Sequence, residues 1–208
     1  MHRREGPYRF LLSAGGTGGH IFPAISVADA LKHKYPDAEF LFIGALGKME
    51  MEKVPKAGYE IVGLNISGMA RSLNFKMFSW PFKLLGSLLK ALKVIRKFKP
   101  HVALGFGGFA SGPAIYMATL LGVRGLIQEQ NSYAGVTNRI LAGKVKKICV
   151  AYDHMDKFFP SGKITKTGNP VRKSIAEFKN IKEEGLSHFD LSASSPVLFV
   201  FGGSQGAL

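Results

Sequence analysis

The chain has 208 residues, which corresponds to one large domain or about one and a half domains of ordinary size. Apolar residues make up 46% and charged residues 20%, so the composition suits a packed core and excludes a disordered or fibrous chain. Lys and Arg number 28 against 14 Asp and Glu, a formal net charge of +14, which favours an anionic partner such as nucleic acid, an acidic membrane or a phosphorylated substrate.

The single cysteine, Cys149, cannot form an internal disulfide, and this favours a reducing compartment such as the cytoplasm. The apolar run near the N-terminus is too short for the core of a signal peptide. Residues 100–123 carry no formal charge, but glycines and prolines interrupt them, so a transmembrane helix is not expected there.

Short apolar runs alternate with helical patterns along most of the chain. The strand-like runs are residues 9–13, 39–43, 61–64, 102–105, 126–128 and 147–150. This alternation predicts an α/β fold with a doubly wound parallel sheet, in which ligands bind at the carboxyl ends of the strands.

The first glycine loop, residues 15–20, follows the first predicted strand, and a helix is expected from Phe22 to Tyr35. Several backbone amides at a helix start with few side chains in the way can bind a phosphate or diphosphate. A dinucleotide fingerprint is absent because Ile21 stands where its third glycine belongs, and the chain has no P-loop motif. A tight turn without a ligand is the alternative interpretation.

The second glycine loop, residues 105–113, repeats this arrangement after the fourth predicted strand. Glu129 and Asn131 follow the next strand and supply a carboxylate and an amide suited to sugar hydroxyls. For Glu129, receiving N–H bonds from its loop is as good an interpretation as a functional role. His20 is a candidate general base, although a lone histidine at a helix start often has only a packing role.

A basic and apolar flank lies between Glu60 and Glu129, a stretch without any Asp or Glu. A helix is predicted from Phe82 to Phe98, with Leu85, Leu88, Leu92 and Ile95 toward the core and Lys83, Lys90 and Lys97 toward solvent. Aromatic residues beside lysines favour docking on an anionic membrane surface. An ordinary amphipathic helix and a nucleic-acid contact remain the alternatives. The predicted membrane patch comprises Met69, Leu73, Phe75, Lys76, Phe78, Trp80, Phe82, Lys83 and Lys90.

The pattern of strand and glycine loop begins again near the end of the chain. Residues 168–172 indicate a turn into a helix, and residues 196–201 indicate a strand that leads into the glycine-rich residues 202–206. We therefore expect a first domain over residues 1–167, and over residues 168–208 a linker with the first βα portion of a truncated second domain.

Five motifs in this order resemble the MurG family of bacterial N-acetylglucosaminyltransferases. They are Gly-Gly-Thr-Gly-Gly-His-Ile-Phe-Pro-Ala at 15–24, Gly-Gly-Phe-Ala-Ser-Gly-Pro at 107–113, Glu-Gln-Asn at 129–131, Gly-Asn-Pro-Val-Arg at 168–172 and Gly-Gly-Ser-Gln-Gly-Ala at 202–207. The resemblance implies the GT-B fold, with two Rossmann-like domains, of which this chain would hold the N-terminal one and the opening of the C-terminal one. In two places the chain departs from the family pattern: Gln128 replaces a common His, and Phe109 a common Tyr.

The resemblance also implies an activity: inverting transfer of N-acetylglucosamine from UDP-N-acetylglucosamine to the 4-hydroxyl of undecaprenyl-diphospho-N-acetylmuramoyl-pentapeptide, which converts lipid I to lipid II in peptidoglycan synthesis. The implied partners are this donor, the lipid I acceptor and the anionic cytoplasmic face of the cell membrane, with no cofactor, metal or nucleic acid. As it stands, the chain is expected to be inactive, because most donor contacts would come from the second domain. A transferase for another nucleotide sugar and a basic nucleotide-binding module are the alternatives.

Specific residues follow from the same resemblance. Its implied catalytic candidates are His20 and Glu129. The implied donor contacts are Thr17, Gly18, Gly19, Asn131, Arg172 and Ser204. The loops implied for the diphosphate-bearing substrates contain Gly15, Gly16, Gly107, Gly108 and Ser111.

Overall fold

The computed structural model describes residues 6–68, 75–176 and 181–200, and the chain divides into two units between Val171 and Arg172. The strands of the first unit are β1 (Arg9–Ser13), β2 (Glu39–Ala45), β3 (Glu60–Leu64), β4 (Val102–Gly105), β5 (Arg124–Glu129), β6 (Lys147–Val150) and β7 (Ile164–Lys166). Its helices are α1 (Gly18–Lys34), α2 (Glu50–Lys56), α3 (Phe75–Phe98), α4 (Ser111–Leu120) and α5 (Val136–Leu141), with 3₁₀ turns at Met155–Lys157 and Ser161–Lys163.

The seven strands form one parallel sheet in the order β3-β2-β1-β4-β5-β6-β7. The strand order reverses direction between β1 and β4, which pair from Phe10 with Val102 to Ser13 with Gly105. In open α/β sheets, ligands bind beyond the carboxyl ends of the strands at this switch point. The two glycine loops follow β1 and β4, so the fold places both at that position.

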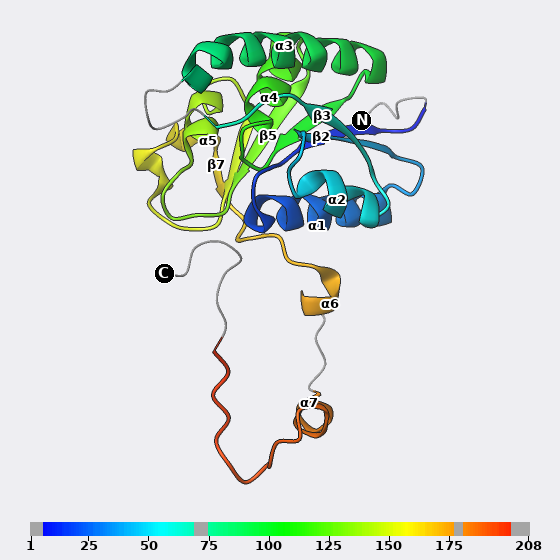
Figure 1. Cartoon of the computed structure of the whole chain (residues 1–208), viewed down its shortest axis with the longest axis vertical. Helices are drawn as coiled ribbons and strands as arrows, with labels where there is room; N and C mark the ends of the chain where they lie inside the picture. Colours follow the sequence, from blue (N-terminus) through cyan, green and yellow to red (C-terminus); the bar gives the residue numbers. More distant parts are fainter. Residues whose placement is uncertain (1–5, 69–74, 177–180, 201–208) are drawn as a thin grey trace. The chain divides into compact units, whose positions relative to one another are not determined.

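Helices cover both faces of the sheet, with α1 and α2 on one side and α3, α4 and α5 on the other (Figure 1). Successive side chains of a strand point to opposite faces. Phe10 and Leu12 accordingly pack in the core beneath α1, whereas Leu11 belongs to the core shared with α3 and α4. Because both faces are covered, the strands are apolar along most of their length, as expected of a parallel sheet.

The structure confirms the predicted parallel α/β sheet and all six predicted strands. It adds β7, which sequence analysis missed. Two helices begin earlier than predicted: α1 begins at Gly18, four residues before Phe22, and α3 begins at Phe75, seven residues before Phe82. The earlier start of α1 places the end of the first glycine loop in the first turn of the helix.

The second unit contains α6 (Lys173–Ala176) and α7 (Lys182–His188). The predicted strand at 196–201 is wrong over residues 196–200, which adopt no regular structure, while residue 201 lies outside the described residues. A strand is held by hydrogen bonds to a neighbouring strand. Residues 172–176 and 181–200 contain no other strand with which it could pair.

Candidate active site

The first glycine loop ends in the first turn of α1. Thr17 is the N-cap, with an extended backbone (φ −143°, ψ 158°), and its carbonyl accepts hydrogen bonds from the amides of His20 and Ile21. The first amides of a helix have no carbonyl in the helix itself to bind, and the helix dipole adds positive potential. The amides of Gly18 and Gly19 therefore lie where an anionic group can be bound.

His20 is half-buried, and its Nδ1 lies 3.0 Å from the carbonyl oxygen of Gly15 and 3.3 Å from Oγ1 of Thr17. A carbonyl oxygen can only accept a hydrogen bond, so this contact assigns the ring proton to Nδ1. Nε2 then carries the lone pair, and it has no hydrogen-bond partner among the described residues. This is the arrangement that a histidine needs to act as a general base.

The second glycine loop packs directly against the first. A Cβ atom added at Gly107 would lie 2.9 Å from Nε2 of His20, and one added at Gly108 would overlap the carbonyl oxygen of Gly15. Both glycines also have positive φ, +91° and +85°, a conformation that other residues rarely adopt. Gly107 and Gly108 are thus required by the contact between the loops, whether or not a ligand is bound.

Three residues of the loops predicted for diphosphate-bearing substrates make internal contacts. The carbonyl of Gly15 binds His20, and the amide of Gly16 donates to the buried carboxylate of Glu50 at 3.1 Å. Ser111 is completely buried, and its hydroxyl donates to the carbonyl of Ser13 at 3.1 Å. In this structure the Gly16 amide and the Ser111 hydroxyl position the loop and tie α4 to β1, while the substrate contacts of these loops stay a prediction.

Glu129, the last residue of β5, is only 1% exposed. One carboxylate oxygen accepts from the backbone and side-chain nitrogens of Asn131 at 3.1 and 3.0 Å. The other accepts from the amide of Gly135 at 3.0 Å and the side chain of Asn138 at 2.9 Å. Four donors on a buried carboxylate fit the interpretation that Glu129 receives N–H bonds from its own loop, and its catalytic role stays a prediction. Asn131 is exposed and keeps its Oδ1 without a partner among the described residues.

Buried amides join the end of β5 to two other segments. Nε2 of Gln130 donates to the carbonyl of Phe106 at 3.0 Å and to Oε1 of Gln128. Nε2 of Gln128 donates to Oδ1 of Asn169 at 3.1 Å, and Nδ2 of Asn169 donates to the carbonyl of Gln130 at 3.2 Å. Gln128, where the family commonly has His, thus takes part in a network that holds the second glycine loop and the segment after β7.

Two predicted donor contacts do not belong to the first unit. Arg172 is the first residue of the second unit, where its carbonyl accepts from the amides of Ile175 and Ala176. Ser204 lies outside the described residues.

The predicted membrane patch coincides in part with the start of α3. Met69 and Leu73 lie outside the described residues; Phe75, Lys76 and Phe78 lie in the first turns of α3, whose described side chains begin at Trp80. Phe82 is 77% exposed, and Nε1 of Trp80 donates to the carbonyl of Ser67 at 3.2 Å.

The structure also places two lysines of the patch and corrects one residue that was predicted to face the core. Lys83 is half-buried, and Nζ of Lys90 donates to the carbonyl of Gly63 at 2.7 Å, so this ammonium is bound to the end of β3. Leu85, predicted to face the core, is 56% exposed. The register of α3 is set by its packing on α4, and this turns Leu85 outward together with Leu89. In the described part of the chain, the helices are all too short or too polar to span a bilayer.

Comparisons with known proteins agree with this architecture. The glycosyltransferase family 28 N-terminal domain matches residues 10–150. A UDP-N-acetylglucosamine--N-acetylmuramyl-(pentapeptide) pyrophosphoryl-undecaprenol N-acetylglucosamine transferase from Cytophaga hutchinsonii is 54% identical over 201 residues, which are 97% of this chain and 54% of the relative. The protein of the same name from Parabacteroides distasonis is 56% identical over 200 residues, 96% of this chain and 54% of the relative.

Among solved structures, MurG from Acinetobacter baumannii matches with a TM-score of 0.67 and 30% identity over 80% of this chain and 47% of that chain. The chain therefore belongs to glycosyltransferase family 28. The resemblance to the MurG family and the predicted fold class are confirmed. The chain spans about half the length of the curated relatives it matches.

Proposed function

We propose that the chain is the acceptor-side half of an enzyme that transfers N-acetylglucosamine from UDP-N-acetylglucosamine to the 4-hydroxyl of undecaprenyl-diphospho-N-acetylmuramoyl-pentapeptide, with inversion. The observation that carries this proposal is the setting of His20 where the two glycine loops meet at the switch point of the sheet. The names of the relatives from Cytophaga and Parabacteroides supply the substrates.

The proposed step moves one proton and one glycosyl group. Nε2 of His20 takes the proton of the acceptor hydroxyl as its oxygen attacks the anomeric carbon of N-acetylglucosamine. The bond between that carbon and the diphosphate oxygen breaks, and its electron pair leaves with UDP. The amides of Gly18 and Gly19 at the start of α1 supply positive potential for the diphosphate-bearing substrates.

The test uses a chain that continues through the donor-binding half found in the relatives, with labelled UDP-N-acetylglucosamine and lipid I as substrates. Replacing His20→Asn is expected to lower kcat by about 100-fold to 10,000-fold, because a general base contributes that much to proton transfer. His33→Asn is the matched control, since His33 is exposed in the last turn of the same helix. Unchanged kcat in the His20 variant would refute its assignment as the base.

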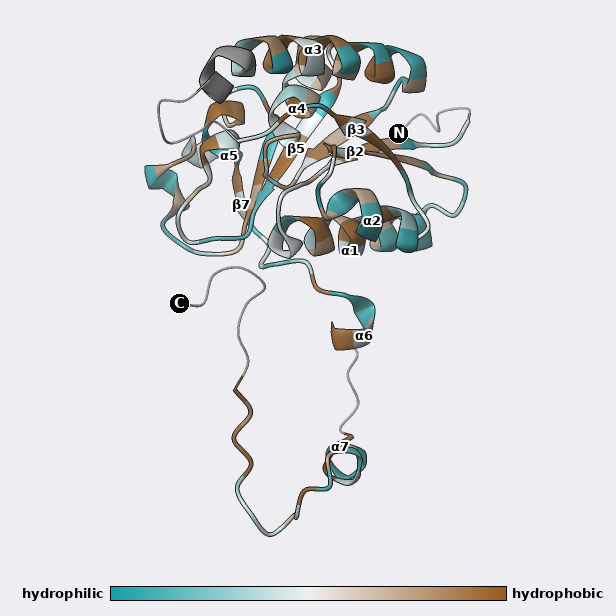
Figure 2. Cartoon of the chain, in the orientation of Figure 1, coloured by the Kyte–Doolittle hydropathy of each residue, from teal (hydrophilic) through white to brown (hydrophobic). Residues whose placement is uncertain are grey.

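We also propose that α3 docks the protein on the cytoplasmic face of the membrane. Phe82, Leu85 and Leu89 share one face of the helix and are 77%, 56% and 58% exposed. Lys93 and Arg96 continue that face and are exposed, so cationic side chains follow the apolar ones along it. Figure 2 shows hydrophobic and hydrophilic residues alternating along α3. Apolar side chains beside cations favour an anionic headgroup region.

Sedimentation with vesicles tests this docking. Replacing Phe82→Ser and Leu85→Ser together is expected to weaken binding to anionic vesicles roughly tenfold or more, because two large apolar side chains no longer leave water. Leu120→Ser is the control, since Leu120 is equally exposed at the end of α4. Binding to DNA with no preference for anionic lipid would overturn the membrane assignment.

A further inference from the structure

The proposed transfer step makes no use of Glu50, a buried acidic group. Glu50, the first residue of α2, is 0% exposed. Its Oε1 accepts from the amide of Ala45 at 2.9 Å, and its Oε2 accepts from the amide of Gly16 at 3.1 Å. No cation pairs with Glu50 among the described residues. Burying a carboxylate is costly unless it is hydrogen-bonded, and here backbone amides from the first glycine loop and from the end of β2 supply the bonds.

The surrounding backbone is shaped to admit this side chain. A Cβ atom at Gly15 would overlap Oε1 of Glu50, and one at Gly44 would overlap its Cγ. Two glycines from different strand ends therefore leave room for one carboxyl group. The backbone thus leaves space for the side chain of Glu50, which comes from the segment after the carboxyl end of β2 and contacts the first glycine loop.

A single peptide unit connects Glu50 to His20. The N–H of the peptide between Gly15 and Gly16 donates to Glu50, and the C=O of the same peptide lies 3.0 Å from Nδ1 of His20. Hydrogen bonds in such a series polarise one another, so a carboxylate on the N–H makes the carbonyl a stronger acceptor. Gly16, with φ +91°, follows this peptide in a conformation that other residues rarely adopt.

We propose that Glu50 is a positioning residue for His20 and acts through the Gly15–Gly16 peptide. The carboxylate orients and polarises this peptide, and the carbonyl in turn holds the proton of the imidazole on Nδ1. The lone pair is thereby kept on Nε2, the nitrogen that the transfer reaction uses. The catalytic consequence rests on the proposed function, whereas the effect on the imidazole is a property of this chain alone.

The experiment is nuclear magnetic resonance of the isotope-labelled 208-residue chain, at a pH where the imidazole of His20 is neutral. The ¹⁵N shifts of His20 are expected to show the proton on Nδ1 in the wild type. In Glu50→Gln, the side chain keeps one oxygen and can no longer accept from both the Gly16 and the Ala45 amides. The other amide faces an N–H₂ group, and this weakens the orientation of the Gly15–Gly16 peptide. The tautomer ratio of His20 is then expected to change roughly fivefold toward Nε2–H, the effect of weakening one ordinary hydrogen bond.

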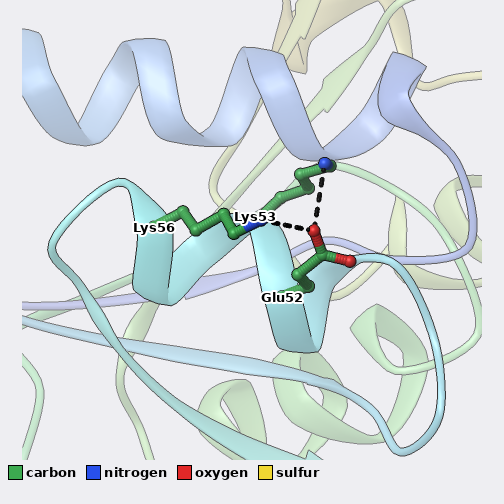
Figure 3. Close-up of polar contacts among 3 residues, drawn as sticks. All are labelled: Glu52, Lys53 and Lys56. Atoms are coloured by element: carbon green, nitrogen blue, oxygen red, sulfur yellow. Dashed lines mark hydrogen bonds and ion pairs between the residues drawn. The ribbon is translucent and has the colours of Figure 1, made fainter.

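Glu52→Gln is the matched control on the same helix. Glu52 is exposed and accepts from Lys53 at 3.3 Å and Lys56 at 2.8 Å (Figure 3). This variant removes the same charge without contact with the glycine loop, so the tautomer ratio of His20 is expected to stay at its wild-type value. An equal change in both variants, or no change in Glu50→Gln, would overturn the proposal.

Two further measurements keep the proposal testable if Glu50→Gln does not fold. In the wild type, a coupling across the hydrogen bond between the Gly16 nitrogen and the Glu50 carboxyl carbon is expected, and a wild-type His20 with its proton on Nε2 would refute the proposal. Glu50→Asp keeps the charge but shortens the reach, so it is expected to move the tautomer ratio in the same direction as Gln. None of these readouts needs a substrate, so a failure to transfer sugar to lipid I would leave their result standing.

Discussion

Two buried carboxylates, Glu50 and Glu129, stand beside the candidate site, and the difference between them is instructive. Both are almost fully buried, and both are bound by N–H donors. The donors to Glu129 all follow it within nine residues, so this carboxylate organises its own loop. Glu50 binds Gly16, which is 34 residues away in the chain, and joins the first glycine loop to the end of β2. Hydrogen bonding to a buried carboxylate thus orders one loop at Glu129, whereas at Glu50 it aligns two segments that are distant in the chain.

The largest effect is expected at Glu129, where four donors depend on one carboxylate. Glu129→Gln replaces one oxygen with an N–H₂ group that faces donors, and we expect a loss of about 3 kcal/mol of unfolding free energy. Glu50→Gln, with two donors, should cost about 2 kcal/mol by the same reasoning. Urea unfolding of both variants measures the difference. A smaller loss at Glu129 than at Glu50 would contradict the ranking.

The contact between the glycine loops can be tested separately from either carboxylate. Gly108→Ala places a Cβ against the carbonyl of Gly15 and strains a backbone with φ +85°, so we expect a loss of roughly 2–3 kcal/mol. Gly122→Ala is the control, because Gly122 has a similar φ of +78° but open space around it. Strain alone should cost about 1 kcal/mol there. Equal losses in thermal unfolding would show that the loops do not press on each other.

The smallest effect is expected at Tyr59, just beyond the end of α2, whose hydroxyl donates to Asp29 of α1 at 2.6 Å. Tyr59→Phe removes one hydrogen bond and should cost about 1 kcal/mol. Because this change loosens α2 without touching Glu50, it shows whether the tautomer of His20 depends on the carboxylate or on the helix. Any shift of that tautomer in Tyr59→Phe would weaken the case for Glu50.

The same tyrosine predicts a pH dependence. Burial, and then the hydrogen bond to Asp29, raise the pKa of Tyr59 well above its usual value. The folded state therefore holds the phenolic proton to higher pH than the unfolded state. The stabilisation is fully present below the ordinary pKa of tyrosine and is lost as the pH rises through the raised one. Unfolding measured from neutral to strongly alkaline pH should show this loss in the wild type and lack it in Tyr59→Phe.

Most of the sheet could be predicted from the sequence because parallel strands buried on both faces are short apolar runs. Strand β7 was missed, since Ile164, Thr165 and Lys166 form a short segment with a single apolar residue. The start of α1 was placed too late because Gly18 and Gly19 are poor helix formers that suit a loop. Leu85 was wrongly predicted to face the core, because the apolar periodicity of the α3 sequence does not reveal which face of the helix packs on α4.

The candidate site was predictable where its motifs are local. The sequence indicated His20 as a candidate base, and for Glu129 it left a catalytic role and a role in its own loop open. Glu50 gave no such signal: it lies between Lys48 and Lys53 beside a second glutamate, a pattern typical of a solvated helix. Its burial depends on Gly15 and Gly44, which only the folded chain brings together. The contact between Gly108 and Gly15 could not be predicted either, because only the folded chain brings these two residues together.

That glycine contact also limits how the two loops can be altered. Each loop leaves space that the other occupies, so a longer side chain at Gly108 is expected to need a matching shift of the backbone at Gly15. An engineer who exchanges these loops between related proteins should therefore transplant the pair as one unit. Chimeras that carry one loop from each parent are expected to be recovered less often than those that inherit both together.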